Sequence, residues 1–165
     1  MQRVGSLEID QDLEFERRQW TVQRVGWVVF LLILIAGLLG LLGGGPLGHA
    51  DASADPLTVG YERFVRKRAP TEIEVQIAPG AASGGEVGVW IERAYLEKFN
   101  IEQVIPEPAE MEAAADRIIF HFTVADAEQP SQIVFDLQPS EPGRLETRVG
   151  LVDGPEVRFS HFIYP

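Results

Sequence analysis

The stretch GWVVFLLILIAGLLGLLGGGPLG, residues 26–48, contains no charged residue and determines how the chain is organised. As a helix, the apolar run over residues 25–45 would be roughly 31 Å long, close to the hydrocarbon thickness of a bilayer. A core helix of a soluble protein seldom stays apolar on every face over such a length. The run therefore predicts a transmembrane helix over residues 25–45.

A secretion signal is the alternative interpretation of this run. Signal peptides usually combine a basic leader with a shorter apolar region of roughly 7–15 residues. Here the leader, residues 1–24, contains five acidic residues. Small-residue cleavage patterns occur at Ala50-Asp51-Ala52 and Ala52-Ser53-Ala54, but they lie well beyond the strongly apolar part. We therefore expect a retained anchor rather than a cleaved signal.

The basic residues near the ends of the run predict its orientation. Three of them precede it closely, namely Arg17, Arg18 and Arg24, and the first one after it is Arg63. This asymmetry predicts a cytoplasmic N-terminus, a partly helical leader and a C-terminal domain outside the plasma membrane of a bacterium. Trp20 and Trp27 are seven residues apart, which places them on one helix face near the cytoplasmic interface.

Small residues recur every four positions within the run, at Ala36, Gly40 and Gly44. Such a stripe allows close approach of another helix, from an integral membrane partner or from a second copy of the chain. The alternative is that glycine is common in membrane spans and that Gly43 to Pro46 end the helix. The segment that follows, residues 46–56, is rich in Gly, Ala, Asp and Pro and predicts a flexible linker.

From residue 57 onward the pattern alternates between apolar and polar residues, which indicates half-buried strands. Strands are predicted within 57–65, 71–77, 86–91, 101–106, 117–124, 132–139, 144–152 and 156–164. A helical turn is expected within 92–99, a solvated loop over 106–116, and a two-residue hairpin turn at Asp153-Gly154. Short strands separated by turn signals predict an all-β antiparallel sandwich over 57–165, with a small β-barrel as the alternative.

The domain resembles immunoglobulin-like and fibronectin-type sandwiches, with Trp90 at the place of a mid-domain core tryptophan, but it has no cysteine pair. The single anchor, the segments GGGPL and YERFVRKRAP and the strand-rich domain together resemble bacterial single-pass membrane proteins without an assigned activity. This resemblance implies an extracytoplasmic β-sandwich and assigns a role to no individual residue.

The segment YERFVRKRAP concentrates four basic residues in an otherwise acidic domain, Arg63, Arg66, Lys67 and Arg68. Three interpretations stay open. The charges protect an edge strand from pairing with another sheet, they dock an acidic face of a partner protein, or they contact anionic lipid headgroups.

Composition and motifs argue against several classes of function. The net charge of −11 argues against nucleic-acid binding, and the lack of cysteine excludes disulfides and thiolate-bound metal. His121 and His161 lie on different predicted strands that could be neighbours in the sheet, where a carboxylate such as Asp136 could complete a metal site. His49 lies in the linker, and no close-spaced ligand pair supports a metal. No nucleophile elbow, P-loop or dinucleotide fingerprint occurs. We therefore expect no cofactor and no enzyme activity.

The sequence as a whole predicts a non-enzymatic interaction module anchored in the membrane, an accessory subunit of a membrane complex. The alternative is an extracytoplasmic domain that binds a ligand or glycan through exposed aromatic side chains such as Tyr61, Phe64 and Tyr164.

Overall fold

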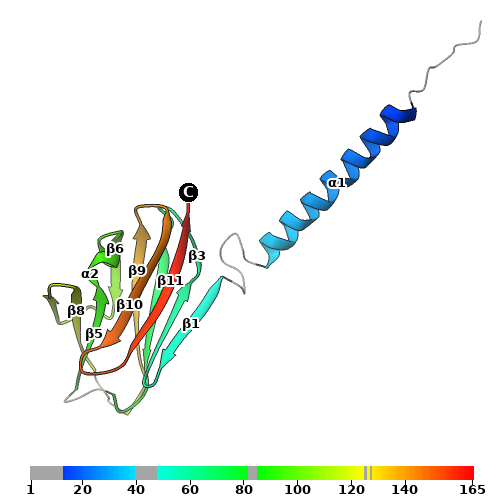
Figure 1. The fold of residues 1–165 in the computed structure, drawn as a ribbon. Coiled ribbons are helices and arrows are strands. Elements are labelled where there is room, and N and C mark those ends of the chain that lie inside the picture. Colours follow the sequence, from blue (N-terminus) through cyan, green and yellow to red (C-terminus); the bar gives the residue numbers. More distant parts are fainter. Residues whose placement is uncertain (1–12, 40–47, 82–84, 125, 127) are drawn as a thin grey trace, which may run out of the picture. The chain divides into compact units, whose positions relative to one another are not determined.

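The structure is a computed structural model of the chain, and it describes residues 13–39, 48–81, 85–124, 126 and 128–165. The chain divides into two compact units between Ala36 and Gly37. The first unit contains a helix and the second unit is a domain of β-strands (Figure 1).

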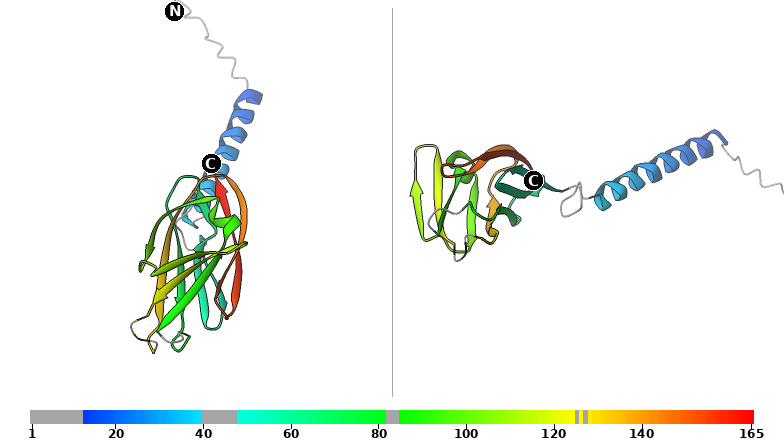
Figure 2. Two further views of the ribbon diagram at one scale, coloured as in Figure 1. Left: turned by 90° about the vertical axis from the view of Figure 1, so that its left-hand side faces the viewer. Right: turned by 90° about the horizontal axis from the view of Figure 1, so that it is seen from below.

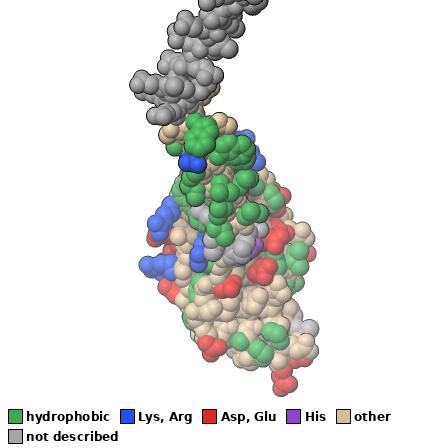
Figure 3. Space-filling view, turned by 90° about the vertical axis from the view of Figure 1, so that its right-hand side faces the viewer, with side chains coloured by type: hydrophobic (Ala, Val, Ile, Leu, Met, Phe, Trp, Pro, Cys, Tyr) green, Lys and Arg blue, Asp and Glu red, His purple; other side chains and the backbone are tan. Residues whose placement is uncertain are grey.

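The helix α1 spans Leu13–Leu38, and its segment Gln19–Leu38 is long and apolar enough to cross a membrane. Large apolar side chains along this segment are exposed, and hydrophobic side chains cover much of the face in view in Figure 3. The helix begins within the predicted leader and ends before the predicted end of the span. Residues 40–45, which include Gly40 and Gly44, lie outside the described residues.

The domain consists of two facing sheets, seen as two layers in Figure 2. One sheet has the order β1-β2-β4-β9-β6, with strands His49–Ala54, Leu57–Glu62, Thr71–Ile77, Ser131–Pro139 and Phe99–Ile105. The other has the order β3-β11-β10-β5-β8-β7, with strands Phe64–Arg66, Glu156–Tyr164, Gly143–Leu151, Glu86–Glu92, Arg117–Thr123 and Glu110–Ala113. All neighbouring strands are antiparallel except β3 and β11. The predicted antiparallel sandwich is confirmed, and the sheets do not close into a barrel.

The core lies between the sheets and is formed by every second residue of the central strands, as the alternating pattern predicts. On β9 the buried residues are Ile133, Phe135 and Leu137. The Phe135 ring meets the ring of Phe120 from β8 edge to face, with centroids 5.1 Å apart. The predicted helical turn is also present, as α2 at Arg93–Leu96.

The flexible linker predicted over residues 46–56 is wrong for residues 49–54, because these residues form the edge strand β1 against β2. Its side chains are small or polar, so its sequence lacks the β-branched and aromatic residues that mark most strands. Ala52 and Ala54 nevertheless pack against the core. The first described strand of the domain therefore begins at His49 rather than at Leu57.

The strand predicted over residues 57–65 is divided at Arg63, where the chain passes from one sheet to the other. The amide of Arg63 donates to the carbonyl of Gly48 at 2.6 Å, and its carbonyl accepts from the amide of Phe162 at 2.7 Å. Arg63 thereby bonds to the residue that precedes β1 of one sheet and to β11 of the other sheet. Beyond it, β3 joins the six-stranded sheet parallel to β11.

The solvated loop predicted over residues 106–116 contains a strand, because Glu110–Ala113 pair with β8 as the edge strand β7. All four residues of β7 are exposed, so no apolar alternation marks them. The predicted turn at Asp153-Gly154 also differs. A four-residue loop, residues 152–155, joins β10 to β11, and Asp153 rather than Gly154 has the positive φ, 60°.

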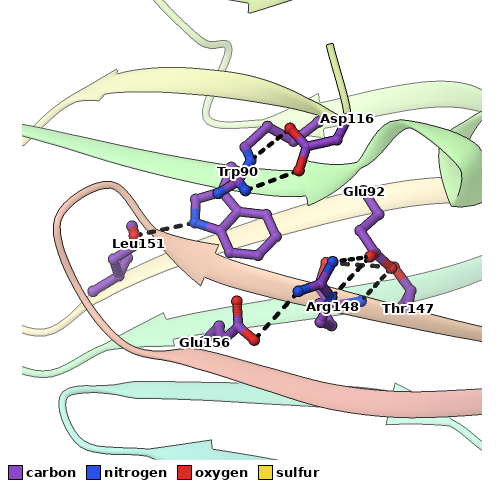
Figure 4. Close-up of polar contacts among 8 residues, drawn as sticks. Trp90, Glu92, Asp116, Thr147, Arg148, Leu151 and Glu156 are labelled. Carbon is purple, nitrogen blue, oxygen red and sulfur yellow. Dashed lines mark hydrogen bonds and ion pairs between the residues drawn. The ribbon is translucent and has the colours of Figure 1, made fainter. Parts of the chain in front are cut away.

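Trp90 is buried, but it lies on the outer face of its sheet rather than in the core between the sheets. Val89 and Ile91 on either side of it point into the core. The indole Nε1 donates to the carbonyl of Leu151 at 3.1 Å, and the Arg117 guanidinium covers the ring at 4.2 Å from its centroid. Figure 4 shows this outer-face cluster, in which Asp116 holds Arg117.

A second group of charges lies beside the indole on the same outer face. Arg148 bonds to Glu92 at 2.6 Å and lies 3.6 Å from Glu156 (Figure 4). The Glu92 carboxylate also accepts the amide of Arg148 at 3.0 Å. These contacts join β5, β10 and β11 on the face that points away from the core.

Candidate functional site

The strands lie roughly along one common axis, some pointing one way and some the other. Each connection between strands therefore lies at one of the two ends of the sandwich. We call the end where the chain enters at Gly48 the entry end, and the opposite end the far end. The far end receives the connections that follow β1, β4, β6, β8 and β10. These connections carry no Lys or Arg and contain five acidic residues: Asp55, Glu107, Asp126, Glu128 and Asp153.

The entry end is rich in basic residues by comparison. The connections that follow β2, β3 and β5 contain Arg63, Lys67, Arg68, Arg93 and Lys98, and Arg66, Arg117 and Arg144 lie at the ends of strands there. On the face shown in Figure 3, the lower end of the domain carries Asp and Glu side chains without Lys or Arg, and side chains of both signs lie above it. Charge is thus separated along the strands.

Several of these cations are paired with nearby carboxylates. Lys98 bonds to Glu141 at 2.7 Å, and this hydrogen bond raises the pKa of the lysine and lowers the pKa of Glu141. Arg117 bonds to Asp116 at 2.9 Å. Arg144 lies 3.3 Å from Glu146, with both side chains more than 60% exposed.

The basic residues predicted from the sequence differ from these paired cations. They are Arg63, Arg66, Lys67 and Arg68. We call them the basic cluster; within the part of the chain that the structure describes, none of its members forms an ion pair. Its backbone is well held, because the Lys67 amide donates to the Tyr164 carbonyl at 2.8 Å and the Arg68 amide to the Pro139 carbonyl at 3.0 Å. Arg68 takes a positive φ of 62° in this turn.

An aromatic and basic surface lies next to the basic cluster on the outer face of the six-stranded sheet. The register places Phe64, Phe162 and Arg144 in one row across β3, β11 and β10, and Arg66 beside Tyr164 at the next outward position. We call these five residues the aromatic–arginine face. Phe162 is 51% exposed. A hollow of about 340 Å³ opens here, lined mainly by Tyr61, Arg63, Phe64, Arg144, Ser160 and Phe162.

The three aromatic residues predicted for ligand binding do not share one surface. Phe64 and Tyr164 both belong to the aromatic–arginine face. Tyr61 borders the hollow, but its ring stacks on Phe159 with centroids 4.5 Å apart. Sequence reasoning missed Phe162 as a site residue. Its signal was present, because the alternation puts this large aromatic on the polar side of its strand.

His161 lies in the core, completely buried. Its Nδ1 bonds to the backbone carbonyl of Glu62, which can only accept, so Nδ1 carries the proton and Nε2 accepts from the Tyr95 hydroxyl at 2.9 Å. Burial lowers the pKa of His161 from 6.5 to about 4, and burial also raises the pKa of Tyr95. Both rings are thus held as neutral partners.

The suggestion that His121 and His161 are neighbours is wrong. His121 pairs with Gly88 on the outer side of β8, whereas His161 points between the sheets from β11. Asp136 lies in the other sheet and His49 begins β1. Among the described residues, no group of three or more histidine or acidic side chains is arranged to hold a metal.

The residues predicted to act at the membrane lie in the other unit. Trp20 and Trp27 are 63% and 65% exposed, and the Arg24 guanidinium lies 4.4 Å from the centroid of the Trp20 ring. Arg17, Arg18 and Ala36 also belong to α1.

Comparison with protein-family models and with curated proteins finds no match. Among solved structures, the chain is similar to the cohesin module from Clostridium perfringens ATCC13124 family 33 glycoside hydrolase. The two share 15% sequence identity with a TM-score of 0.44, over 65% of this chain and 94% of that module. The similarity is one of β-sandwich architecture alone.

Proposed function

We propose that the chain is a membrane-anchored, non-enzymatic interaction module, an accessory subunit of a membrane complex. Its N-terminus lies in the cytoplasm of a bacterium and its β-sandwich lies outside the plasma membrane. The observation that carries this proposal is the exposure of α1. Its large apolar side chains from Val22 to Leu38 are 42–80% exposed. Because each such side chain gains about 1.5–3 kcal/mol on burial, the helix needs a bilayer or another helix around it.

The interior of the domain supports a role in binding rather than in catalysis. Its most perturbed titratable groups, His161 and Tyr95, are 0% and 2% exposed and hydrogen-bond to each other. The buried Thr71 donates to Glu62 at 2.9 Å. Among the described side chains, no buried polar atom lacks a hydrogen-bond partner. The polar groups of the interior are therefore engaged in hydrogen bonds within the fold.

Two surfaces are proposed as contacts. The stripe Ala36, Gly40 and Gly44 would pack against a helix of an integral membrane partner or of a second copy, since small side chains allow close approach. The basic cluster would be the second contact, outside the membrane, where cations that form no ion pair among the described residues favour an acidic surface.

The first experiment is the intact mass of the protein extracted from membranes, together with protease accessibility of the domain in spheroplasts. A mass near 18.3 kDa with a cleavable domain supports a retained anchor. Loss of roughly the first 50 residues, with a soluble domain, would show a cleaved signal and refute the anchor.

Helix packing is tested by crosslinking in membranes. Ala36→Leu should weaken crosslinks to the partner helix, because it fills the stripe. Ile35→Leu, one position away, changes shape without adding volume and is the matched control. Equal crosslinking by both variants would contradict the packing role of the stripe.

A second candidate function, binding of an extracytoplasmic ligand or glycan, is favoured by the hollow beside Phe162. Calorimetric titration of the domain with cell-envelope glycans tests it. Saturable binding that Phe162→Ser abolishes would support this candidate, and silence across the polymers would count against it.

A further inference from the structure

We propose that the entry end of the sandwich binds anionic lipid headgroups of the membrane in which α1 is anchored, with the basic cluster and the aromatic–arginine face as the contact surface. This inference rests on the proposed anchor and adds the chemistry that the domain recognises. The ligand is the phosphate-bearing headgroup layer.

The first support is the separation of charge along the strands. The far-end connections hold five acidic residues and no cation, whereas the basic cluster lies at the entry end. Such a domain presents one end to an anionic surface and is repelled through the other. The domain can therefore be oriented by a charged bilayer even though its net charge is negative.

The second support is that edge protection accounts for only part of the basic cluster. Strand β3 is an edge strand, which fits the protective interpretation, but it spans only Phe64–Arg66. Arg66 alone belongs to that strand. Arg63 precedes it, and Lys67 and Arg68 follow it, so their charges do not line its open edge. Among the described residues these four cations form no ion pair, which leaves them available to phosphate oxygens.

The third support is the composition of the adjoining face. Phe162 is half exposed and lies between Phe64 and Arg144 in one row. Aromatic rings favour the boundary between headgroups and acyl chains, and a guanidinium binds phosphate in a bidentate manner. Among the described residues, Arg144 forms an ion pair with Glu146 alone, in an exposed pair that exchanges readily for another anion.

The fourth support is the distance along the chain. The Arg63 amide bonds to the carbonyl of Gly48, so the basic cluster lies beside the point of entry. Nine residues separate Leu38, the end of α1, from Gly48. Even fully extended, this segment reaches about 35 Å. The entry end therefore lies no farther than about this distance from the end of α1, so the headgroup layer is within its reach.

The experiment uses the full chain reconstituted in vesicles. Because the chain contains no cysteine, Ser160→Cys places a single fluorophore in the hollow. Vesicles of phosphatidylcholine are compared with vesicles that also contain about 30% phosphatidylglycerol, both with nitroxide-labelled headgroups. We expect at least about threefold stronger quenching in the anionic vesicles, and the excess should vanish in ~0.5 M salt.

Variants identify the residues that carry the effect. Replacing Arg63, Arg66, Lys67 and Arg68 together by glutamine should lower quenching to the level of neutral vesicles. Since one cation near a charged surface changes binding about fivefold, Arg66→Gln alone should give a measurable loss. Arg158→Gln is the matched control, because Arg158 is also exposed and outward on β11 but lies away from the entry end. Phe162→Ser should reduce quenching while every cation remains.

The outcomes separate the two proposals. If the protein does not stay with neutral vesicles during flotation, the proposed anchor is wrong and this inference fails with it. If it stays with them but quenching is equal in neutral and anionic vesicles, the anchor stands and headgroup binding is refuted, which leaves an acidic partner protein as the target. If the fourfold variant does not fold, the salt titration of the wild-type sequence decides, and quenching that persists at high salt overturns the inference.

Discussion

The burial of His161 on β11 makes the stability of the domain depend on pH. The ring is fully buried among the aromatic rings of Tyr61, Tyr95, Phe99 and Phe159. Its two nitrogens bond to the carbonyl of Glu62 and to the hydroxyl of Tyr95. This arrangement suits a neutral imidazole, because the ring already uses its single proton toward Glu62 and accepts one from Tyr95.

The sign and size of the effect follow from the pKa. Burial lowers the pKa of His161 from 6.5 to about 4. Between these two values the unfolded chain binds a proton that the folded domain excludes, so the free energy of unfolding falls as the pH falls. The full effect is about 3 kcal/mol, and about 2.5 kcal/mol of it is reached on going from about pH 7.5 to about pH 4.5.

The assay is urea unfolding of residues 48–165 at these two pH values, for the wild-type sequence and for His161→Gln. The glutamine amide can donate to Glu62 and accept from Tyr95, but it does not titrate. Carboxylates contribute to the pH dependence of both proteins, so the difference between the two isolates the imidazole. The wild-type domain should lose about 2.5 kcal/mol more than the variant on acidification.

The control is His121→Gln, which replaces a histidine whose side chain is one-third exposed on the outer face. Comparing the two variants separates the buried ring from the general effect of removing a histidine. If the wild-type domain and His161→Gln lose the same stability on acidification, the argument from burial is wrong.

Two further predictions concern glycine and turn positions. Gly150→Ala should lower the free energy of unfolding by about 1–3 kcal/mol and shift the Trp90 fluorescence, because its Cβ would lie 2.6 Å from the indole ring. Gly60→Ala should lower the free energy of unfolding by less, because the nearest atom to its new Cβ is the flexible end of Asp51 at 3.3 Å. Equal losses of stability in the two variants would contradict this reasoning. In the β10–β11 loop the φ of Asp153 is 60°, a backbone conformation that glycine adopts easily and a β-branched residue does not. Asp153→Val should therefore lower the melting temperature, whereas Asp153→Gly should not. An unchanged melting temperature for the valine variant would refute the backbone strain expected at this position.

The alternation of apolar residues was enough to predict the strands that line the core. On β4, Ile73, Val75 and Ile77 are buried, as the pattern requires. The pattern could not place Trp90, because it lies between Val89 and Ile91 and the apolar run has no polar side. Its position depends on Gly150 in the neighbouring strand, where the missing side chain leaves room for the ring.

The missed strands are edge strands whose sequences carry little apolar signal. Strand β1 is HADASA and β7 is EMEA, and both depend on backbone bonds to a stronger neighbour. Such pairing is a tertiary effect that overrides the low strand propensity of alanine, aspartate and glutamate. Sequence reasoning therefore placed the start of the domain too late and treated β7 as a loop.

The candidate site was half visible in the sequence. The basic cluster is contiguous along the chain and needed no structure to be noticed. The aromatic–arginine face is assembled from three strands, and its central row depends on the parallel pairing of Phe64 with Phe162 and on the register of Arg144. Parallel pairing of so short a strand cannot be derived from alternation, so Phe162 and Arg144 were not recognised as neighbours.

The charge separation of the domain is a consequence of strand number as much as of composition. Successive connections lie at opposite ends of the sandwich, except at Arg63, where the chain changes sheets without reversing its direction. When residues 106–116 are treated as one loop, Glu107 and Asp116 belong to the same end. Strand β7 divides this segment, so that Glu107 lies at the far end and Asp116 lies at the entry end, bonded to Arg117. The carboxylates of the entry-end connections, Glu97, Asp116 and Glu141, each lie within 4 Å of a neighbouring cation, whereas among the described residues the basic cluster forms no such ion pair.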